Sequence, residues 1–236
     1  MTEHPGDAGR KLSRTEASDA VSGLGWRYIL GIVRTCVPVD SLAQSADVAA
    51  RVVAAAGPGA DGHLRLDIRR DRLIISVQTL ATESMTTRDI ELARQITSVV
   101  TGLGRATSPD IGSGAPRSVQ VLEIAIDALD IASIRPFWQA VLGYADEAGP
   151  PNPGAGLVDP IGQGPTIWFQ QMTEPRPERN RIHFDVSVPH DEAPRRIEAT
   201  LAAGGTLLSD AEAPAFWVLA DAEGNEACVT TWQGRD

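Results

Sequence analysis

The chain has 236 residues, of which 42% are hydrophobic and 22% charged, so it has enough apolar material for one large core or two ordinary ones and is not a disordered or fibrous protein. Its 21 basic and 31 acidic residues give a formal net charge of −10, which opposes binding to a nucleic-acid backbone. The two cysteines, Cys36 and Cys228, form no disulfide framework and no apolar run is long enough to span a bilayer, so we expect a cytoplasmic protein without a membrane partner.

A stretch rich in glycine, serine and proline, Arg105–Ser118, lies near the middle of the chain and carries no apolar periodicity. It predicts a linker between two domains. The charge divides there as well: residues 1–106 have 13 basic and 12 acidic residues, whereas residues 107–236 have 8 and 19, a net charge of −11. We therefore predict a disordered tail, a first domain, a linker and a second domain at residues 1–12, 13–106, 107–117 and 118–236.

The first domain is predicted to alternate helices and strands. Two capping boxes, at Ser13–Glu16 and Thr86–Asp89, predict helix starts, and the second of these helices continues to Gly104. Alternating apolar residues on both sides of Arg70 and Asp71 predict a hairpin. The other expected elements are one strand over Trp26–Val37, a helix over Asp40–Ala56, and the hairpin strands Leu64–Arg69 and Leu73–Thr79.

The second domain contains two copies of one pattern, in which a strand is followed by a helix and further strands. In each copy the helix ends at glycine, a common helix C-terminus. The first copy is predicted as strand Val119–Ile126, helix Ile131–Leu142 and strand Thr166–Met172. The second is predicted as strand Arg181–Val188, helix Glu192–Ala203 and strands Phe216–Ala220 and Ala227–Trp232.

Three sequence motifs of the second domain resemble those of the glyoxalase/bleomycin-resistance/dioxygenase superfamily, also called the vicinal oxygen chelate superfamily. They are DIASIRPFWQAVLG at Asp130–Gly143, NRIHFDV at Asn180–Val186 and LADAEGNEACV at Leu219–Val229, in the family's order and spacing. The resemblance implies two βαβββ units that form a curved, incomplete barrel. Its concave face would hold a small molecule, often with a divalent metal.

The resemblance also places residues at the four metal positions of the superfamily. Glu123 and His183 fall on two of them and are plausible metal ligands. Phe169 or Gln170 stands at the third, and Cys228 replaces the glutamate of the fourth. Because a catalytic metal normally has three protein ligands, we expect at best a partial set, and no cofactor is certain. In the alternative, metal-free interpretation, His183 and Asp185 are hydrogen-bonding pocket residues and Cys228 is a buried thiol.

Aromatic side chains suggest a flat or apolar ligand for this pocket. The alternative is that most of these aromatics belong to the core. Glu226 follows the turn of the last hairpin, and it either braces that hairpin or contacts the ligand. Long-range attraction by the acidic second domain would favour neutral or cationic ligands over phosphorylated ones. The residues predicted to bind the ligand are Glu123, Trp138, Trp168, Gln170, His183, Asp185, Trp217 and Glu226.

Residues Gly62–Ala93 of the first domain, with GHLRLDIRRDRLIISVQT followed by TTRDIELA, are similar to the pterin-4a-carbinolamine dehydratases. The resemblance implies a small α+β sheet with helices on one face, and homo-oligomers formed through sheet edges and helices. It implies acid and base groups around a reduced pterin, a task that imidazole suits. His63 matches one of three family histidines, whereas Gly62 and Leu80 replace the other two. Asp61 is near enough in sequence to act as a substitute carboxylate.

The sequence therefore predicts an α+β protein, a dehydratase-like sandwich followed by a vicinal-oxygen-chelate domain of two βαβββ units. One functional interpretation is a dehydratase with catalytic His63 and Asp61 and weak or absent activity, fused to a domain that binds a pterin or a flat metabolite. A second is a non-catalytic, resistance-type binding protein. A third is a metal-dependent lyase, isomerase or dioxygenase centred on Glu123 and His183.

Overall fold

The computed structural model describes residues 9–110, 119–149, 152, 154–175 and 182–234, and it divides the chain into two compact units, residues 1–121 and 122–236. The start of the predicted tail, residues 1–8, lies outside the described residues. So do residues 111–118, which hold most of the predicted linker, and Asn180 and Arg181 of the second motif. No helix among the described residues is both long and apolar enough to cross a membrane.

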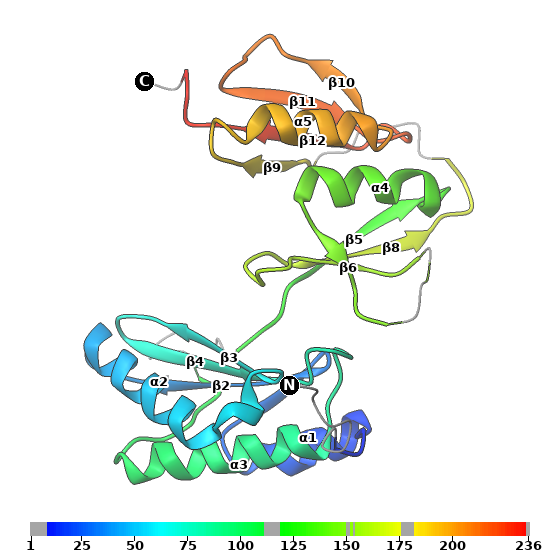
Figure 1. The fold of residues 1–236 in the computed structure, drawn as a ribbon. Helices are drawn as coiled ribbons and strands as arrows, with labels where there is room; N and C mark the ends of the chain where they lie inside the picture. The colour runs from blue at the N-terminus through cyan, green and yellow to red at the C-terminus, as the bar shows by residue number, and fades with distance from the viewer. Residues whose placement is uncertain (1–8, 111–118, 150–151, 153, 176–181, 235–236) are drawn as a thin grey trace. The chain divides into compact units, whose positions relative to one another are not determined.

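The first unit is a four-stranded antiparallel sheet with its helices on one face (Figure 1). The strands lie in the order β1-β2-β4-β3, so each of the two hairpins contributes one central strand and one edge strand. The strands are β1 (Arg27–Ile29), β2 (Ile32–Pro38), β3 (Leu64–Ile68) and β4 (Arg72–Val77). The helices are α1 (Arg14–Ser22), α2 (Leu42–Ala56) and α3 (Thr87–Gly102), with a 3₁₀ turn η1 (Pro58–Ala60) between α2 and β3.

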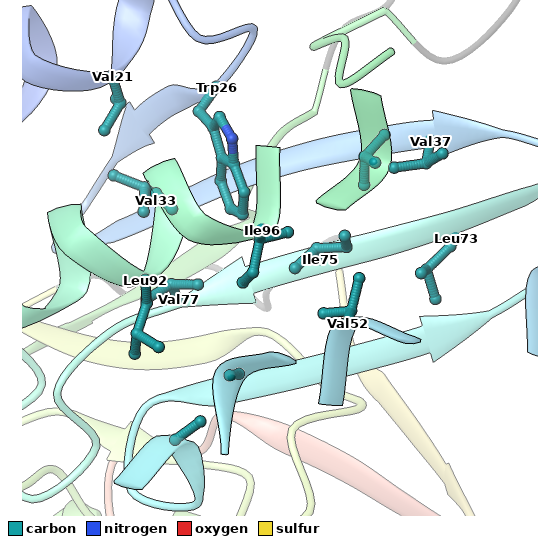
Figure 2. Packing of buried hydrophobic residues seen from close by; sticks show 14 of the residues in the cluster. Val21, Trp26, Val33, Val37, Val52, Leu73, Ile75, Val77, Leu92 and Ile96 are labelled. Carbon is teal, nitrogen blue, oxygen red and sulfur yellow. The ribbon is translucent and has the colours of Figure 1, made fainter. Parts of the chain in front are cut away.

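Alternation along the central strands of this sheet builds the core. Leu73, Ile75 and Val77 of β4 are fully buried toward the helices, where they meet Leu92 and Ile96 of α3 (Figure 2). Each such side chain stabilises the fold by roughly 1.5–3 kcal/mol relative to an exposed one. Trp26 is also fully buried, and its indole N–H donates to Thr97 Oγ1 at 2.8 Å, so the largest core side chain keeps its polar atom satisfied.

The prediction of a single strand over Trp26–Val37 is wrong, because the chain turns back on itself in the middle of that run. Ile29 of β1 pairs with Ile32 of β2, and the two residues between them, Leu30 and Gly31, have φ values of 44° and 83°. Two consecutive residues with positive φ form the type of tight turn that matches the twist of a hairpin. The turn gives little signal in the sequence because leucine is an unusual residue at such a φ.

Both predicted capping boxes are confirmed. The Ser13 hydroxyl accepts from the N–H of Glu16 while the Glu16 carboxylate accepts from the N–H of Ser13, and Thr86 and Asp89 make the same reciprocal pair at the start of α3. The two helices begin one residue after the capping residue, as the pattern predicts.

Ser108 of the predicted linker and the first residues of the predicted second domain, Val119 and Gln120, are attached to the first unit. The strand predicted to begin at Val119 therefore begins at Glu123. Ser108 exchanges backbone hydrogen bonds of 2.9 and 2.8 Å with Cys36 of β2. The N–H of Val119 donates to Pro109 O at 2.9 Å, and the Arg34 guanidinium donates to Gln120 O at 2.7 Å. Residues on both sides of the undescribed segment therefore add to the first unit.

The second unit contains two consecutive βαβββ arrangements, which confirms that expectation (Figure 1). Each forms a four-stranded sheet with one parallel strand pair, in the orders β5-β8-β7-β6 and β10-β11-β12-β9. The first consists of β5 (Glu123–Ala128), α4 (Ile131–Leu142), β6 (Ala145–Asp146), β7 (Leu157–Val158) and β8 (Thr166–Gln171). The second consists of β9 (Phe184–Ser187), α5 (Ala193–Ala202), β10 (Thr206–Ser209), β11 (Phe216–Ala220) and β12 (Glu226–Thr230).

Helices α4 and α5 contact each other and share one core with both sheets of this unit. Strand residues that point toward the helices are buried, among them Ile126, Ile167, Leu219 and Val229. Because side chains alternate along a strand, the intervening residues lie on the opposite face of each sheet. We call this second face the open face, and it carries the predicted site residues of the domain that are not in the core.

Candidate functional site

The first unit contains a buried carboxylate paired with an imidazole. His63 Nδ1 lies 2.7 Å from Asp89 Oδ1, and the two side chains are 14% and 0% exposed. The other carboxylate oxygen, Oδ2, accepts from the Thr86 N–H at 2.6 Å and from the hydroxyls of Thr79 and Thr86 at 2.8 and 2.9 Å. Asp89 is thus fixed by four hydrogen bonds, and it holds His63 in one orientation.

This pairing decides which imidazole nitrogen is available for chemistry. An ionised carboxylate only accepts hydrogen bonds, so His63 donates to Asp89 through Nδ1–H. In the neutral ring Nε2 then carries the lone pair and can take a proton. Such an arrangement can hold an imidazole in the orientation that a general base needs.

Asp61, the other predicted catalytic residue, lies apart from this pair. It is exposed, directly follows the 3₁₀ turn, and makes no side-chain hydrogen bond to His63 in the part of the chain that the structure describes. It borders a small open hollow of about 100 Å³, which is lined by Val53, Gly57, Ala60, Asp61, Leu64 and Leu66.

Sequence reasoning assigned Asp89 to helix capping and missed its contact with His63. Both roles are real, since one oxygen caps α3 and the other accepts from the imidazole. The available signal was the motif TTRDIELA, whose aspartate was used only for helix capping.

In the second unit three potential metal ligands converge on the open face of one sheet. His183 Nδ1 lies 3.1 Å from Asp185 Oδ1 and 3.9 Å from Cys228 Sγ, and the three donor atoms all lie within 4.8 Å of one another. The register explains the convergence, because Cys228 of β12 pairs with Asp185 of β9 while His183 stands two residues before Asp185 on the same side. The His183 and Asp185 side chains are 50% and 60% exposed, whereas Cys228 is buried.

These donors suit a transition metal. Zinc binds nitrogen, oxygen and sulfur at about 2.0–2.3 Å, so the donors of a tetrahedral site stand roughly 3.4–3.6 Å apart. The observed separations require only small side-chain adjustments. A set of imidazole, thiol and carboxylate favours zinc, cobalt, nickel or iron over magnesium or calcium. The cluster is not a nucleophilic relay, because Cys228 and Asp185 both approach Nδ1, whereas a relay uses both ring nitrogens.

Glu123, the other predicted metal ligand, does not join this cluster. It begins β5 on the open face of the other sheet, opposite Thr166, and the described residues contain no second group of three such donors. The cluster thus contains His183 and adds Asp185 and Cys228 to it, whereas the pairing of Glu123 with His183 stays a prediction. Phe169 is buried in the core, and Gln170 is exposed beside Asp127 of β5.

The predicted aromatic residues divide between the core and the open face. Trp138 is buried, its ring meets Phe184 edge to face, and its N–H donates to Asp221 Oδ2 at 3.0 Å. Trp217 pairs with Val229 and packs against the same core. Both tryptophans therefore lie on the side of the helices, and their contact with a ligand stays a prediction. Trp168 lies on the open face and is 40% exposed.

The last hairpin motif is largely structural. Asp221 accepts from the backbone N–H groups of Glu223 and Asn225 at 2.9 Å, in addition to the indole of Trp138. The Glu223 carboxylate accepts from the N–H groups before α4, at 2.9 and 2.7 Å. Glu226 is half-buried, two residues from Cys228 and on the same face, and its contact with a ligand stays a prediction.

Residues 123–230 match the family model of the glyoxalase-like domain. The second unit is a glyoxalase-like domain. A search of curated proteins found no match to the chain. Among solved structures, the chain is similar to a glyoxalase/bleomycin resistance protein/dioxygenase family enzyme from Burkholderia phytofirmans PsJN, with 19% identity over 46% of this chain and 95% of that one, and a TM-score of 0.35.

Two further solved structures are similar to parts of the chain. A fosfomycin resistance protein from Listeria monocytogenes is 12% identical over 47% of this chain and 89% of its own, with a TM-score of 0.36. A transcriptional coactivator/pterin dehydratase from Brucella melitensis is 18% identical over 38% of this chain and 98% of its own, with a TM-score of 0.34.

Proposed function

We propose that the glyoxalase-like domain binds a divalent transition metal through His183, Asp185 and Cys228, and with it a small organic molecule. The observation that carries the proposal is the convergence of an imidazole nitrogen, a carboxylate oxygen and a sulfur within 4.8 Å on an open sheet face. When bound, such a metal would act as a Lewis acid toward an oxygen of the ligand.

The residues of the chain would prepare the site in specific ways. Asp185 holds the imidazole of His183 beside the Cys228 thiol. Cys228 must lose its proton to become a ligand, so we expect metal affinity to rise with pH. Ser187 of β9 and Thr230 of β12 pair with each other two residues further along, on the same face as Asp185 and Cys228. Their hydroxyls lie 2.8 Å apart and could hydrogen-bond a polar group of the ligand.

This site is compatible with a lyase, isomerase or dioxygenase and with a resistance-type protein that binds its ligand without turnover. Conversion of a bound ligand would support the enzyme, and stoichiometric binding without conversion would support the binding protein.

Calorimetric titration of metal-stripped protein with Zn²⁺, Co²⁺, Ni²⁺ and Mn²⁺ tests the metal proposal. We expect one ion to bind per chain, and we expect His183→Ala, Asp185→Asn and Cys228→Ser to weaken binding about 100-fold or more. His190→Ala, at another exposed histidine of this unit, is the control and should bind as the parent does. Absence of binding, or equal binding by all variants, would contradict the proposal.

We propose for the first unit a dehydratase-type activity on a reduced 4a-hydroxypterin, with His63 as the base. The contact between His63 and the buried Asp89 favours this second function. Gly62 and Leu80 stand where related dehydratases carry histidines, and the Leu80 N–H donates to Gly62 O at 2.9 Å, so both lie next to His63. Each absent histidine costs about 10²- to 10⁴-fold in rate, and we expect slow turnover.

The rate of dehydration of a 4a-hydroxytetrahydropterin, compared with the spontaneous reaction, tests this second function. His63→Ala should abolish any enzymatic rate, Asp61→Asn reports whether the exposed carboxylate takes part, and His190→Ala should leave the rate unchanged. If the parent protein shows no rate above the spontaneous one, the proposed activity is wrong.

Self-association through the first unit also stays a proposal. Light scattering of the full chain at several concentrations would give its mass, and a monomer at all concentrations would contradict it.

A further inference from the structure

One tryptophan of the glyoxalase-like domain stands on an open sheet face among very small neighbours. Trp168 of β8 is 40% exposed and pairs with Ala125 of β5. On its other side, Leu157 of β7 pairs with Ile167, and continuing that antiparallel register brings Gly156 opposite Trp168. A methyl group and a glycine flank the indole, so the strands beside it present no large side chain to cover it.

Carboxylates surround this indole. Glu123 and Asp127 lie two residues to either side of Ala125, on the same face of β5. Glu147 stands close to Gly156. If Gly156 carried a Cβ atom, that atom would lie 3.1 Å from a carboxylate oxygen of Glu147. Within the part of the chain that the structure describes, the side chains of Glu123, Asp127 and Glu147 make no ion pair and no hydrogen bond.

The basic residues that the structure describes in this unit form no ion pair with these three carboxylates. Arg135 pairs with Asp146 at 2.8 Å, and Arg195 and Arg196 pair with Glu192 at 2.6 and 3.4 Å. These arginines lie on α4 and α5, which cover the opposite face of the sheets. Among the residues that the structure describes in this unit, the charges are thus separated by face, with carboxylates left around Trp168.

We infer that this face binds a planar organic cation, which stacks on the indole of Trp168 between Glu123, Asp127 and Glu147. An aromatic face attracts positive charge, and the carboxylates add attraction while repelling phosphates and carboxylic acids. The inference rests on the proposed small-molecule role of the domain and names its ligand class. It does not require the metal, because none of these residues belongs to the group of His183, Asp185 and Cys228.

Equilibrium dialysis of metal-stripped full-length protein with three probes of similar shape tests this inference. The probes are N-methylquinolinium as the cation, quinoline at a pH where its ring is uncharged, and 1-naphthoate as the anion. We expect the cation to bind about tenfold more tightly than the neutral ring, no binding of the anion, and weaker binding of the cation at high salt.

Variants assign the binding to residues. Trp168→Leu should weaken binding of the cation about two- to fivefold, and Trp168→Phe, which keeps an aromatic ring and the fold, should weaken it less. The double variant Glu123→Gln, Asp127→Asn keeps Glu147 and the indole, so it should bind the cation more weakly than the parent does and prefer it over the neutral ring by a smaller factor. Trp232→Leu, at a tryptophan of the same unit that is 61% exposed, is the matched control and should bind as the parent does.

Equal binding of the three probes by the parent protein, or equal losses in Trp168→Leu and Trp232→Leu, would overturn the inference. Metal binding measured on the same samples separates the two proposals. A protein that binds the cation but no metal refutes only the metal site, and one that binds metal but does not discriminate between probes refutes only the cation site.

Discussion

The two imidazole–carboxylate pairs of this protein have the same chemistry in opposite surroundings. His63 and Asp89 lie 2.7 Å apart around a carboxylate with no exposure and three further hydrogen bonds, whereas His183 and Asp185 lie 3.1 Å apart with both side chains at least half exposed. Burial makes the first pair part of the fold, because its loss leaves several buried donors unsatisfied. Because the second pair is exposed, we expect it to contribute little to the stability of the fold.

The largest effect should come from breaking the buried pair. Asp89→Ala leaves the His63 ring, the Thr86 N–H and the Thr79 hydroxyl without their acceptor, so we expect a loss of about 3 kcal/mol in the free energy of unfolding. Asp185→Ala, the matched change in the exposed pair, should alter it by less than about 0.5 kcal/mol in metal-free protein. Denaturation by urea, followed by circular dichroism, measures both. Similar losses in the two variants would contradict the proposed difference between the buried pair and the exposed pair.

Adding metal should make the exposed pair matter for stability almost as much as the buried pair. A metal present at 100 times its dissociation constant stabilises the folded state by about 2.7 kcal/mol. We expect this gain for the parent protein and for Asp89→Asn, and its absence in Cys228→Ser and after addition of a chelator. A thermal melt with and without Zn²⁺ tests it, and an equal gain in Cys228→Ser would show that the metal binds elsewhere.

A smaller effect should follow from removing the hydrogen bond between the indole of Trp138 and Asp221. Trp138→Phe keeps the aromatic packing but removes the N–H that donates to Asp221, so we expect a loss of about 1–2 kcal/mol. Metal affinity should stay close to that of the parent, because Trp138 lies on the helix side of the sheet. Titration of this variant with Zn²⁺ checks the second expectation. A loss of metal binding would mean that the hydrogen bond of Trp138 also positions the proposed metal ligands.

The smallest expected effect concerns pH and the first helix. A backbone hydrogen bond from Ser13 is the main reason that the pKa of Glu16 falls to about 2, from 4.5. Since the folded pKa is depressed, the stabilisation is present above pH 4.5 and is lost as the pH falls through about 2. The protection factors of the α1 amides, which correct for the intrinsic pH dependence of exchange, should fall over this window in the parent protein, and Glu16→Gln should remove this fall. An unchanged profile in Glu16→Gln would contradict the capping explanation.

Local patterns in the sequence predicted several elements well. Helix α4 spans Ile131–Leu142 and strand β11 spans Phe216–Ala220, as predicted, because glycine, capping and apolar spacing are signals carried by neighbouring residues. The short strands β6, β7 and β10 were not predicted individually, since two to four residues cannot show a period. The turn at Leu30 was missed because its backbone conformation is unusual for leucine.

The candidate sites depend on contacts between residues far apart in the chain. His63 and Asp89 are 26 residues apart, and they meet only because β3 and the start of α3 come together. Cys228 joins His183 through the parallel pairing of β12 with β9, a register that the sequence of either strand does not specify. His183 and Asp185 were predicted from the resemblance of the motif NRIHFDV, which is local information because both residues lie in one short segment.

The absorption spectrum of metal-stripped protein titrated with Co²⁺ tests the central claim most directly, because a thiolate bound to Co²⁺ gives a charge-transfer band in the near ultraviolet. We predict that this band grows to one equivalent in the parent protein, disappears in Cys228→Ser, and persists in Cys36→Ser, since Cys36 is buried in the first unit. A band that survives Cys228→Ser, or no band in the parent protein, would contradict a metal site at His183, Asp185 and Cys228.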